Sequence, residues 1–184
     1  MARLRTLGAG ALLGAVVLVG APAGAWAQPV TDYDMPFPCG QEWNGTTRSS
    51  HSPSPRSIDW NRADDDGDPV VASAPGVVRT ADSTSARGYG HHVVVDHGDG
   101  ESTVYAHLDE VHVVAGQRVD QAAQLGTVGS TGNSTGPHLH YEQRLDGQDV
   151  EAWFDGAAFV YGSTQRSANC VDVPMAANMI GKPA

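Results

Sequence analysis

The chain has 184 residues, of which 40% are hydrophobic and 17% are charged, a composition typical of one globular domain with leader and tail segments. It carries 11 Lys and Arg against 21 Asp and Glu, for a formal net charge of −10. Because an acidic surface repels nucleic acid, this balance argues against a nucleic-acid partner.

The first 27 residues have the features of an export signal. Arg3 and Arg5 form a basic start, an apolar stretch runs from Leu7 to Val19, and Ala25-Trp26-Ala27 matches a cleavage site. The apolar stretch is short for a bilayer and lacks basic residues on its far side, which argues against a membrane anchor. We therefore expect a secreted, extracellular chain without stable membrane insertion. Cleavage leaves nine basic against 21 acidic residues, a net charge of −12.

The chain has two cysteines, Cys39 and Cys170. In an exported protein such a pair predicts a disulfide, here closing a long loop, although two buried free thiols are the alternative. Neither cysteine belongs to a C-x-x-C pattern, so the sequence does not support a zinc site with sulfur ligands.

The middle of the chain predicts strands. Short β-branched runs alternate with turn residues roughly every eight to twelve positions, and Gly98-Asp99-Gly100 is a hairpin signal. This pattern predicts an all-β fold, an antiparallel sandwich or barrel, with no long amphipathic helix. The predicted strands are 69–72, 76–80, 92–96, 102–107, 111–114, 124–128 and 138–144.

His138-Leu139-His140 is the first candidate site. Residues two apart on a strand point to the same face, so the two imidazoles can address one small site while Leu139 points into the core. The preceding loop, residues 129–137, consists mainly of small residues and is expected to be a flexible rim of a cleft. Two solvent-facing histidines on a strand would explain the same pattern.

Tyr105-Ala106-His107 supplies a third histidine on a neighbouring predicted strand. The same alternation places Tyr105 and His107 on one face, and a third imidazole favours a shared site over a surface position. We interpret the remaining strand-region histidines as surface or strand residues; they are His91, His92, His97 and His112.

Zinc in catalytic sites commonly takes three nitrogen or oxygen ligands and leaves one position for water. His51, Asp59 and His140 would supply three such ligands, and the prolines between His51 and Asp59 would stiffen that loop. The alternatives are an exposed loop histidine at position 51 and a turn or cap residue at position 59.

Together these stretches resemble the zinc peptidoglycan endopeptidases typified by lysostaphin, LytM and the β-lytic metallopeptidases. The resemblance covers about half the chain, in the order and spacing of the family. It is carried by Ser57-Ile58-Asp59-Trp60, Tyr105-Ala106-His107-Leu108 and Gly129–Glu142, with support from Val70–Val78 and Val95–Gly100.

The resemblance implies a barrel-sandwich hybrid fold and assigns roles to the histidines. Asp59 and His140 match metal ligands, whereas His107 and His138 match the two catalytic histidines beside the zinc-bound water. Many relatives have their first ligand histidine four residues before the aspartate, where this chain has Pro55. His51, eight residues before it, is the replacement, because branches similar to the β-lytic enzymes have a longer spacing.

The expected organisation is a signal peptide (1–27), an N-terminal arm (28–50), a lysostaphin-like peptidase domain (51–161) and a C-terminal arm (162–184). The expected function of this monomer is zinc-dependent cleavage of the peptide stems or cross-bridges of cell-wall peptidoglycan. One alternative is a catalytically degenerate relative that binds the wall or regulates a hydrolase. A lysine-modified carrier is disfavoured because the only lysine is Lys182, near the terminus.

Overall fold

The structure is a computed structural model that describes residues 28–48 and 54–170. These residues form strands, turns and loops. The strands are β1 (Glu42–Thr46), β2 (Ile58–Asn61), β3 (Pro69–Val71), β4 (Gly76–Asp82), β5 (His91–Gly98), β6 (Glu101–Val111), β7 (Arg118–Val119), β8 (Gln124–Val128), β9 (Leu139–Leu145), β10 (Gln148–Val150), β11 (Trp153–Phe154), β12 (Ala157–Ala158) and β13 (Thr164–Arg166).

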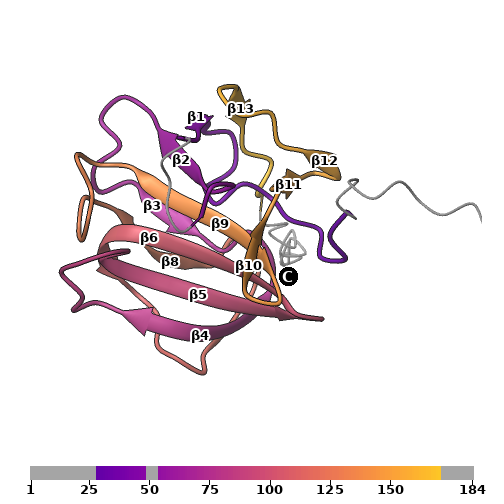
Figure 1. The fold of residues 1–184 in the computed structure, drawn as a ribbon, viewed down its shortest axis with the longest axis horizontal. Coiled ribbons are helices and arrows are strands. Elements are labelled where there is room, and N and C mark those ends of the chain that lie inside the picture. Colours follow the sequence, from indigo (N-terminus) through magenta and orange to yellow (C-terminus); the bar gives the residue numbers. More distant parts are fainter. Residues whose placement is uncertain (1–27, 49–53, 171–184) are drawn as a thin grey trace, which may run out of the picture.

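One antiparallel sheet organises the domain, in the order β13-β1-β2-β9-β6-β5-β4-β7 (Figure 1). β10 pairs with β9, and β8 pairs with both β6 and β3, so the sheet folds back behind its own centre. β11 and β12 form a separate hairpin. The predicted all-β antiparallel fold is confirmed.

Six of the predicted strands correspond to β3, β4, β5, β6, β8 and β9. The prediction of a separate strand over 111–114 was wrong. β6 continues to Val111, and the chain then enters a turn at Gly116, whose φ of 85° suits glycine. β1 and β13, which come from the segments expected to be arms, pair with each other at the sheet edge.

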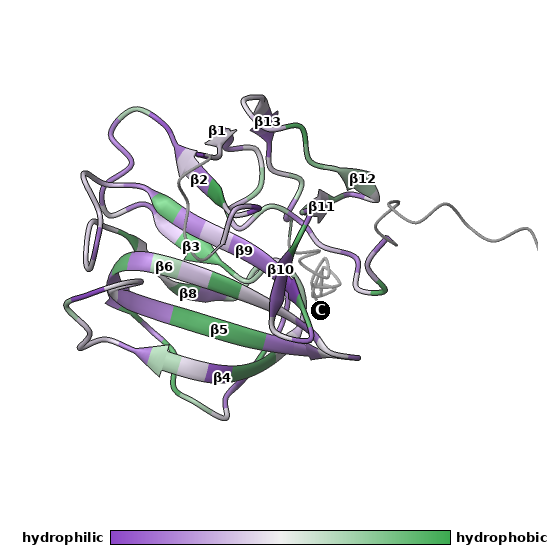
Figure 2. Ribbon diagram, viewed as in Figure 1, coloured by the Kyte–Doolittle hydropathy of each residue, from purple (hydrophilic) through white to green (hydrophobic). Residues whose placement is uncertain are grey.

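The core fills the inner face of the folded sheet. Alternation along the central strands brings Val93, Tyr105 and Tyr141 inward, where all three are fully buried. The hydrophobic middle of β5 is visible in Figure 2. The opposite face of the same strands carries a small apolar group of Val94, Val104 and Ala106, with Tyr89 packed against it.

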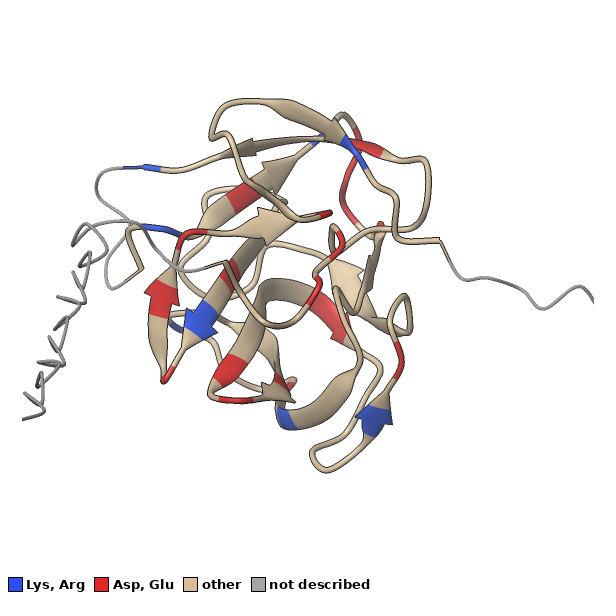
Figure 3. Cartoon of the chain, turned by 90° about the vertical axis from the view of Figure 1, so that its right-hand side faces the viewer, with Lys and Arg blue, Asp and Glu red and all other residues tan. Residues whose placement is uncertain are grey.

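Acidic residues lie on many strand ends and loops, and basic residues are fewer (Figure 3). This distribution agrees with the negative net charge of the sequence. Among the described residues, no helix has the length and apolarity needed to cross a membrane.

A disulfide joins Cys39 to Cys170, as the sequence predicted. The Cα atoms of the two cysteines lie 4.7 Å apart. The bond connects the two ends of the described domain across a separation of 131 residues.

We expect the double variant Cys39→Ser/Cys170→Ser to lose about 2–5 kcal/mol of unfolding free energy, because the unfolded chain is no longer constrained. Urea unfolding without reductant measures this loss. An unchanged midpoint would contradict it.

The side chain of His97, on β5, is held by hydrogen bonds on both of its ring nitrogens rather than free at the surface. Its Nδ1 is 2.8 Å from the carbonyl oxygen of Pro75, and its Nε2 is 2.9 Å from Thr103 Oγ1. Burial lowers the pKa of His97 below its usual 6.5, although the bond to Pro75 opposes that shift. The folded state therefore resists a proton that the unfolded chain accepts.

The free energy of unfolding should consequently fall as the pH falls below 6.5, since the unfolded state then binds more protons. We expect His97→Asn, which can keep a donor toward Pro75, to reduce this slope by at most about 1.4 kcal/mol per pH unit, the limit for one proton. Unfolding measured between pH 5 and pH 7, taken as an approximate range around the usual histidine pKa, tests it. His112→Asn, at an exposed position, should keep the slope.

Candidate metal and catalytic site

The register of three strands assembles the centre of the site. Asp59 on β2 lies opposite His140 on β9, and His140 lies opposite Ala106 on β6. Directly opposed residues share a face, so the carboxylate and the imidazole are neighbours on the outer face of the sheet. Leu139 and Trp60, one residue away on each strand, are fully buried in the core.

His107 reaches this outer face through a β-bulge. His91 pairs with Leu108 and His92 pairs with Ala106, which leaves His107 as the extra residue, with a φ of 61°. The prediction that Tyr105 and His107 share a face was therefore wrong. The Tyr105 hydroxyl is buried and accepts a hydrogen bond from the Ser73 N–H, while His107 turns toward His138.

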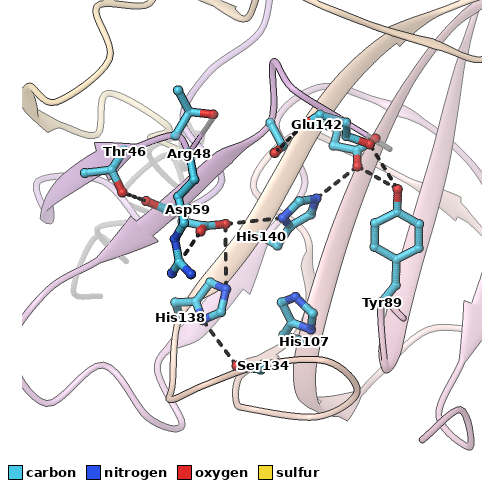
Figure 4. A network of polar contacts seen from close by, with 12 residues as sticks. Thr46, Arg48, Asp59, Tyr89, His107, Ser134, His138, His140 and Glu142 are labelled. Carbon is cyan, nitrogen blue, oxygen red and sulfur yellow. Dashed lines mark hydrogen bonds and ion pairs between the residues drawn. The ribbon is translucent and has the colours of Figure 1, made fainter. Parts of the chain in front are cut away.

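Asp59 lies at the centre of the site, with three other side chains around its carboxylate (Figure 4). Its Oδ1 lies 3.2 Å from His140 Nδ1 and 3.6 Å from His138 Nε2. Its Oδ2 lies 3.4 Å from a terminal nitrogen of Arg48, whose side chain is 55% exposed. Asp59 itself is only 1% exposed, so its carboxylate is buried among the nitrogens of these three side chains.

Two backbone carbonyls orient the other histidines. His107 Nδ1 lies 2.8 Å from the oxygen of Thr131, and His138 Nδ1 lies 2.8 Å from the oxygen of Gly136. A carbonyl only accepts, so each Nδ1 carries a proton and each neutral ring keeps its lone pair on Nε2. The two rings are 4.9 Å apart between centroids, which allows both to serve one reacting group.

The protonation of the site follows from its burial. Burial lowers the pKa of His107 to about 4, with repulsion from His138 and His140 acting in the same direction. Burial also opposes protonation of His140, but hydrogen bonds to Asp59 and Glu142 outweigh it and raise that pKa. His107 is therefore neutral near pH 7.

The 129–137 loop was expected to be flexible, but several contacts hold it against the strands. Thr131 Oγ1 accepts a bond from the His91 N–H at 2.9 Å and donates to the oxygen of Leu108 at 2.7 Å. A Cβ added to Gly90 would lie 2.4 Å from the carbonyl carbon of Thr131, so this close approach requires glycine. These contacts fix the carbonyl that orients His107.

Glu142, Tyr89 and Arg144 were not predicted as site residues. Glu142 Oε1 lies 2.9 Å from His140 Nε2 and accepts a hydrogen bond from the Tyr89 hydroxyl at 2.7 Å. Burial opposes ionisation of Glu142, but the bonds from His140, Ser54 and Tyr89 outweigh it and lower its pKa to about 2. Strand alternation from His140 would have indicated Glu142, whereas nothing in the sequence indicated Tyr89.

The donor chemistry of Asp59 and His140 fits zinc, since a carboxylate oxygen and an imidazole nitrogen face one another in a buried setting. Within residues 28–48 and 54–170, no group of three ligand-type side chains has the geometry to hold a metal. The third predicted ligand, His51, lies outside the described residues. The structure thus brings together Asp59, His107, His138 and His140.

The model of peptidase family M23 matches residues 56–152, which include all four of these residues. This chain belongs to peptidase family M23. The assignment agrees with the resemblance inferred from the sequence, and the match begins one residue after Pro55.

Proteins similar to this M23 chain include two bacterial enzymes. The DD-carboxypeptidase/endopeptidase Mpg of Neisseria meningitidis is 48% identical over 84 residues, which is 46% of this chain and 19% of Mpg. Protease LasA of Pseudomonas aeruginosa is 32% identical over 150 residues, which is 73% of this chain and 34% of LasA. The chain therefore spans between about a fifth and a third of the length of these relatives.

Among solved M23 structures, a mutant catalytic domain of the prophage-encoded protein EnpA from Enterococcus faecalis superposes with a TM-score of 0.51. It is 32% identical in sequence, and the superposition covers 59% of this chain and 87% of that domain. The peptidase fold is therefore shared over more than half of this chain.

Proposed function

We propose that this M23 chain is an exported zinc endopeptidase that hydrolyses peptide bonds in bacterial peptidoglycan. The observation that carries the proposal is the convergence of one buried carboxylate and three buried imidazoles on the outer face of the sheet. They come from β2, β6, β9 and the residue just before β9. Catalysis by such a site needs both metal ligands and proton-transfer groups, and the cluster offers side chains for each role.

Asp59, through its carboxylate, and His140, through Nδ1, would hold the metal, with His51 as the third ligand. Zinc, when bound, supplies a Lewis acid that acidifies water and polarises a scissile carbonyl. Residue burial supports this role, because His140 is 7% exposed and Asp59 1%, so water competes weakly for their electron pairs.

His107 and His138 would carry the proton transfers. Each ring presents Nε2 once Nδ1 is bound to a carbonyl, so a neutral ring can take a proton there and a protonated ring can donate one. One histidine takes the proton of the attacking water, and the other stabilises the developing oxyanion or protonates the leaving amine. Their fixed orientation reduces the entropy cost of both steps.

The peptidoglycan substrate and the exported location rest on three further observations. Two proteins similar to this chain have names that indicate such a substrate. Mpg of Neisseria meningitidis is named a DD-carboxypeptidase/endopeptidase, and ShyA of Vibrio cholerae is named a peptidoglycan DD-endopeptidase. The first 27 residues have the features of an export signal, and the Cys39–Cys170 disulfide suits an oxidising compartment. A negatively charged enzyme would bind an anionic wall through specific contacts with its peptides.

Digestion of purified peptidoglycans with different cross-bridges tests the proposal. The zinc-loaded protein should release new amino termini from at least one wall type, and a chelator should abolish the release until zinc is restored. The identity of the new terminal residue names the bond that is cleaved. No release from any wall by protein shown to contain zinc would contradict the peptidase function.

A further inference from the structure

We propose that Glu142, held by Tyr89 and Arg144, is a positioning residue that directs His140 Nδ1 toward the metal. The inference rests on the metal site of the proposed function and extends it from the ligands to the groups behind them. Glu142 acts through His140 and does not touch the reacting atoms.

The His140 ring is held at both nitrogens. Its Nδ1 lies 3.2 Å from Asp59 Oδ1 on one side, and its Nε2 lies 2.9 Å from Glu142 Oε1 on the other. An ionised carboxylate only accepts, so Nε2 must carry the proton, and the lone pair of the neutral ring is left on Nδ1. Figure 4 shows the ring between the two carboxylates.

Glu142 is itself fixed by strong donors. Arg144 Nε donates to its Oε2 at 2.6 Å, and the Tyr89 hydroxyl donates to its Oε1 at 2.7 Å. A terminal nitrogen of Arg144 donates to the Tyr89 hydroxyl at 2.8 Å, which closes a ring of contacts. Because Glu142 is 1% exposed, water cannot replace these partners.

Tyr89 contributes a second constraint through packing. Its ring centroid is 5.5 Å from that of His140, and it packs against the small apolar group that contains Ala106. Ala106 lies directly opposite His140 across the sheet, where its small side chain leaves room for the two rings. The hydrogen bonds at its two nitrogens thus set the orientation of the His140 ring, and packing against Tyr89 limits its tilting.

The test is zinc affinity of the purified full-length chain, measured by competition with a chromogenic chelator. Glu142→Gln should weaken zinc binding by about 10- to 100-fold, the effect typical of removing a carboxylate that orients a ligand histidine. Tyr89→Phe keeps the ring and removes only the hydroxyl, so it should give a smaller loss of affinity. The visible spectrum of Co²⁺-loaded protein should change in both variants, because the ligand field depends on the His140 orientation.

Two matched variants control for general damage. Tyr161→Phe removes a hydroxyl that donates to the oxygen of Arg56 at 2.7 Å, and Glu101→Gln alters a buried carboxylate that accepts the N–H groups of Val30 and Thr31. Both should bind zinc as the unmodified chain does.

Folded Tyr89→Phe and Glu142→Gln variants with unchanged zinc affinity would overturn the inference, as would equal losses in the two controls. An unmodified chain that binds zinc but cleaves no peptidoglycan would refute the proposed function and leave this inference intact. An unmodified chain that binds no zinc would refute both. Far-ultraviolet circular dichroism identifies any variant that fails to fold, and Tyr89→Phe then decides the outcome.

Discussion

Asp59→Ala is expected to abolish zinc binding and peptidoglycan hydrolysis together. Asp59 is the residue toward which His140 Nδ1 and His138 Nε2 both point, at 3.2 and 3.6 Å, and it is almost completely buried. Its loss removes one proposed ligand and the negative charge that would balance a divalent cation in a low-dielectric setting. We expect hydrolysis to fall by at least about 10⁴-fold, since the metal is what acidifies water near neutral pH.

The measurement pairs metal analysis of the purified variant with release of amino termini from peptidoglycan. His140→Ala should behave in the same way, and His51→Ala should lose zinc if His51 is the third ligand. Asp68→Ala is a matched control, because Asp68 forms an ion pair with Arg62 at 2.6 Å and is not part of the site. Stoichiometric zinc in folded Asp59→Ala would remove Asp59 from the ligand set.

His107→Ala and His138→Ala are expected to separate chemistry from metal binding. Each should lower the turnover of peptidoglycan peptides by about 10²- to 10⁴-fold, the contribution typical of a positioned acid or base. Each should retain stoichiometric zinc, because both rings are oriented by the carbonyls of Thr131 and Gly136 and act through Nε2 in the proposed mechanism.

Turnover and zinc content are measured on the same preparations of these variants. His112→Ala replaces an exposed histidine paired with Glu110 and should leave both quantities unchanged. A variant of His107 or His138 that loses zinc would reassign that residue as a ligand. Turnover near that of the unmodified chain would exclude it from the proton transfers.

Local patterns in the sequence were sufficient for much of the fold. The β-branched runs predicted β5 and β6, because a strand buried on one face must alternate and its neighbours must be joined by turn residues. β1 and β13 were missed, because their sequences hold few apolar residues in alternation. They are stabilised by pairing with each other, and β1 also pairs with β2.

The predicted strand over 111–114 shows the same limit. Its residues have high β propensity, yet the ladder ends at Val111. Propensity describes how well a residue fits a pleated surface, and it does not say whether a partner strand is present at that place. The turn around Gly116 directs the chain toward β7 and its pairing with β4.

The sequence by itself determined the chemical groups of the site and part of their arrangement. The spacing of His138 and His140 placed both on one face, because side chains on a strand repeat every two residues. The two cysteines of an expected exported chain predicted the disulfide that joins Cys39 to Cys170. These features depend on local geometry or on residue counts.

Only the tertiary structure decided how the groups meet. His107 reaches the site because a β-bulge, set by the pairing of β5 with β6, reverses the face that alternation predicts. The Tyr89 hydroxyl reaches Glu142 only because the loop before β5 brings Tyr89 over β9. Both arrangements join residues distant in sequence, and the register that aligns them is fixed by packing of the whole sheet.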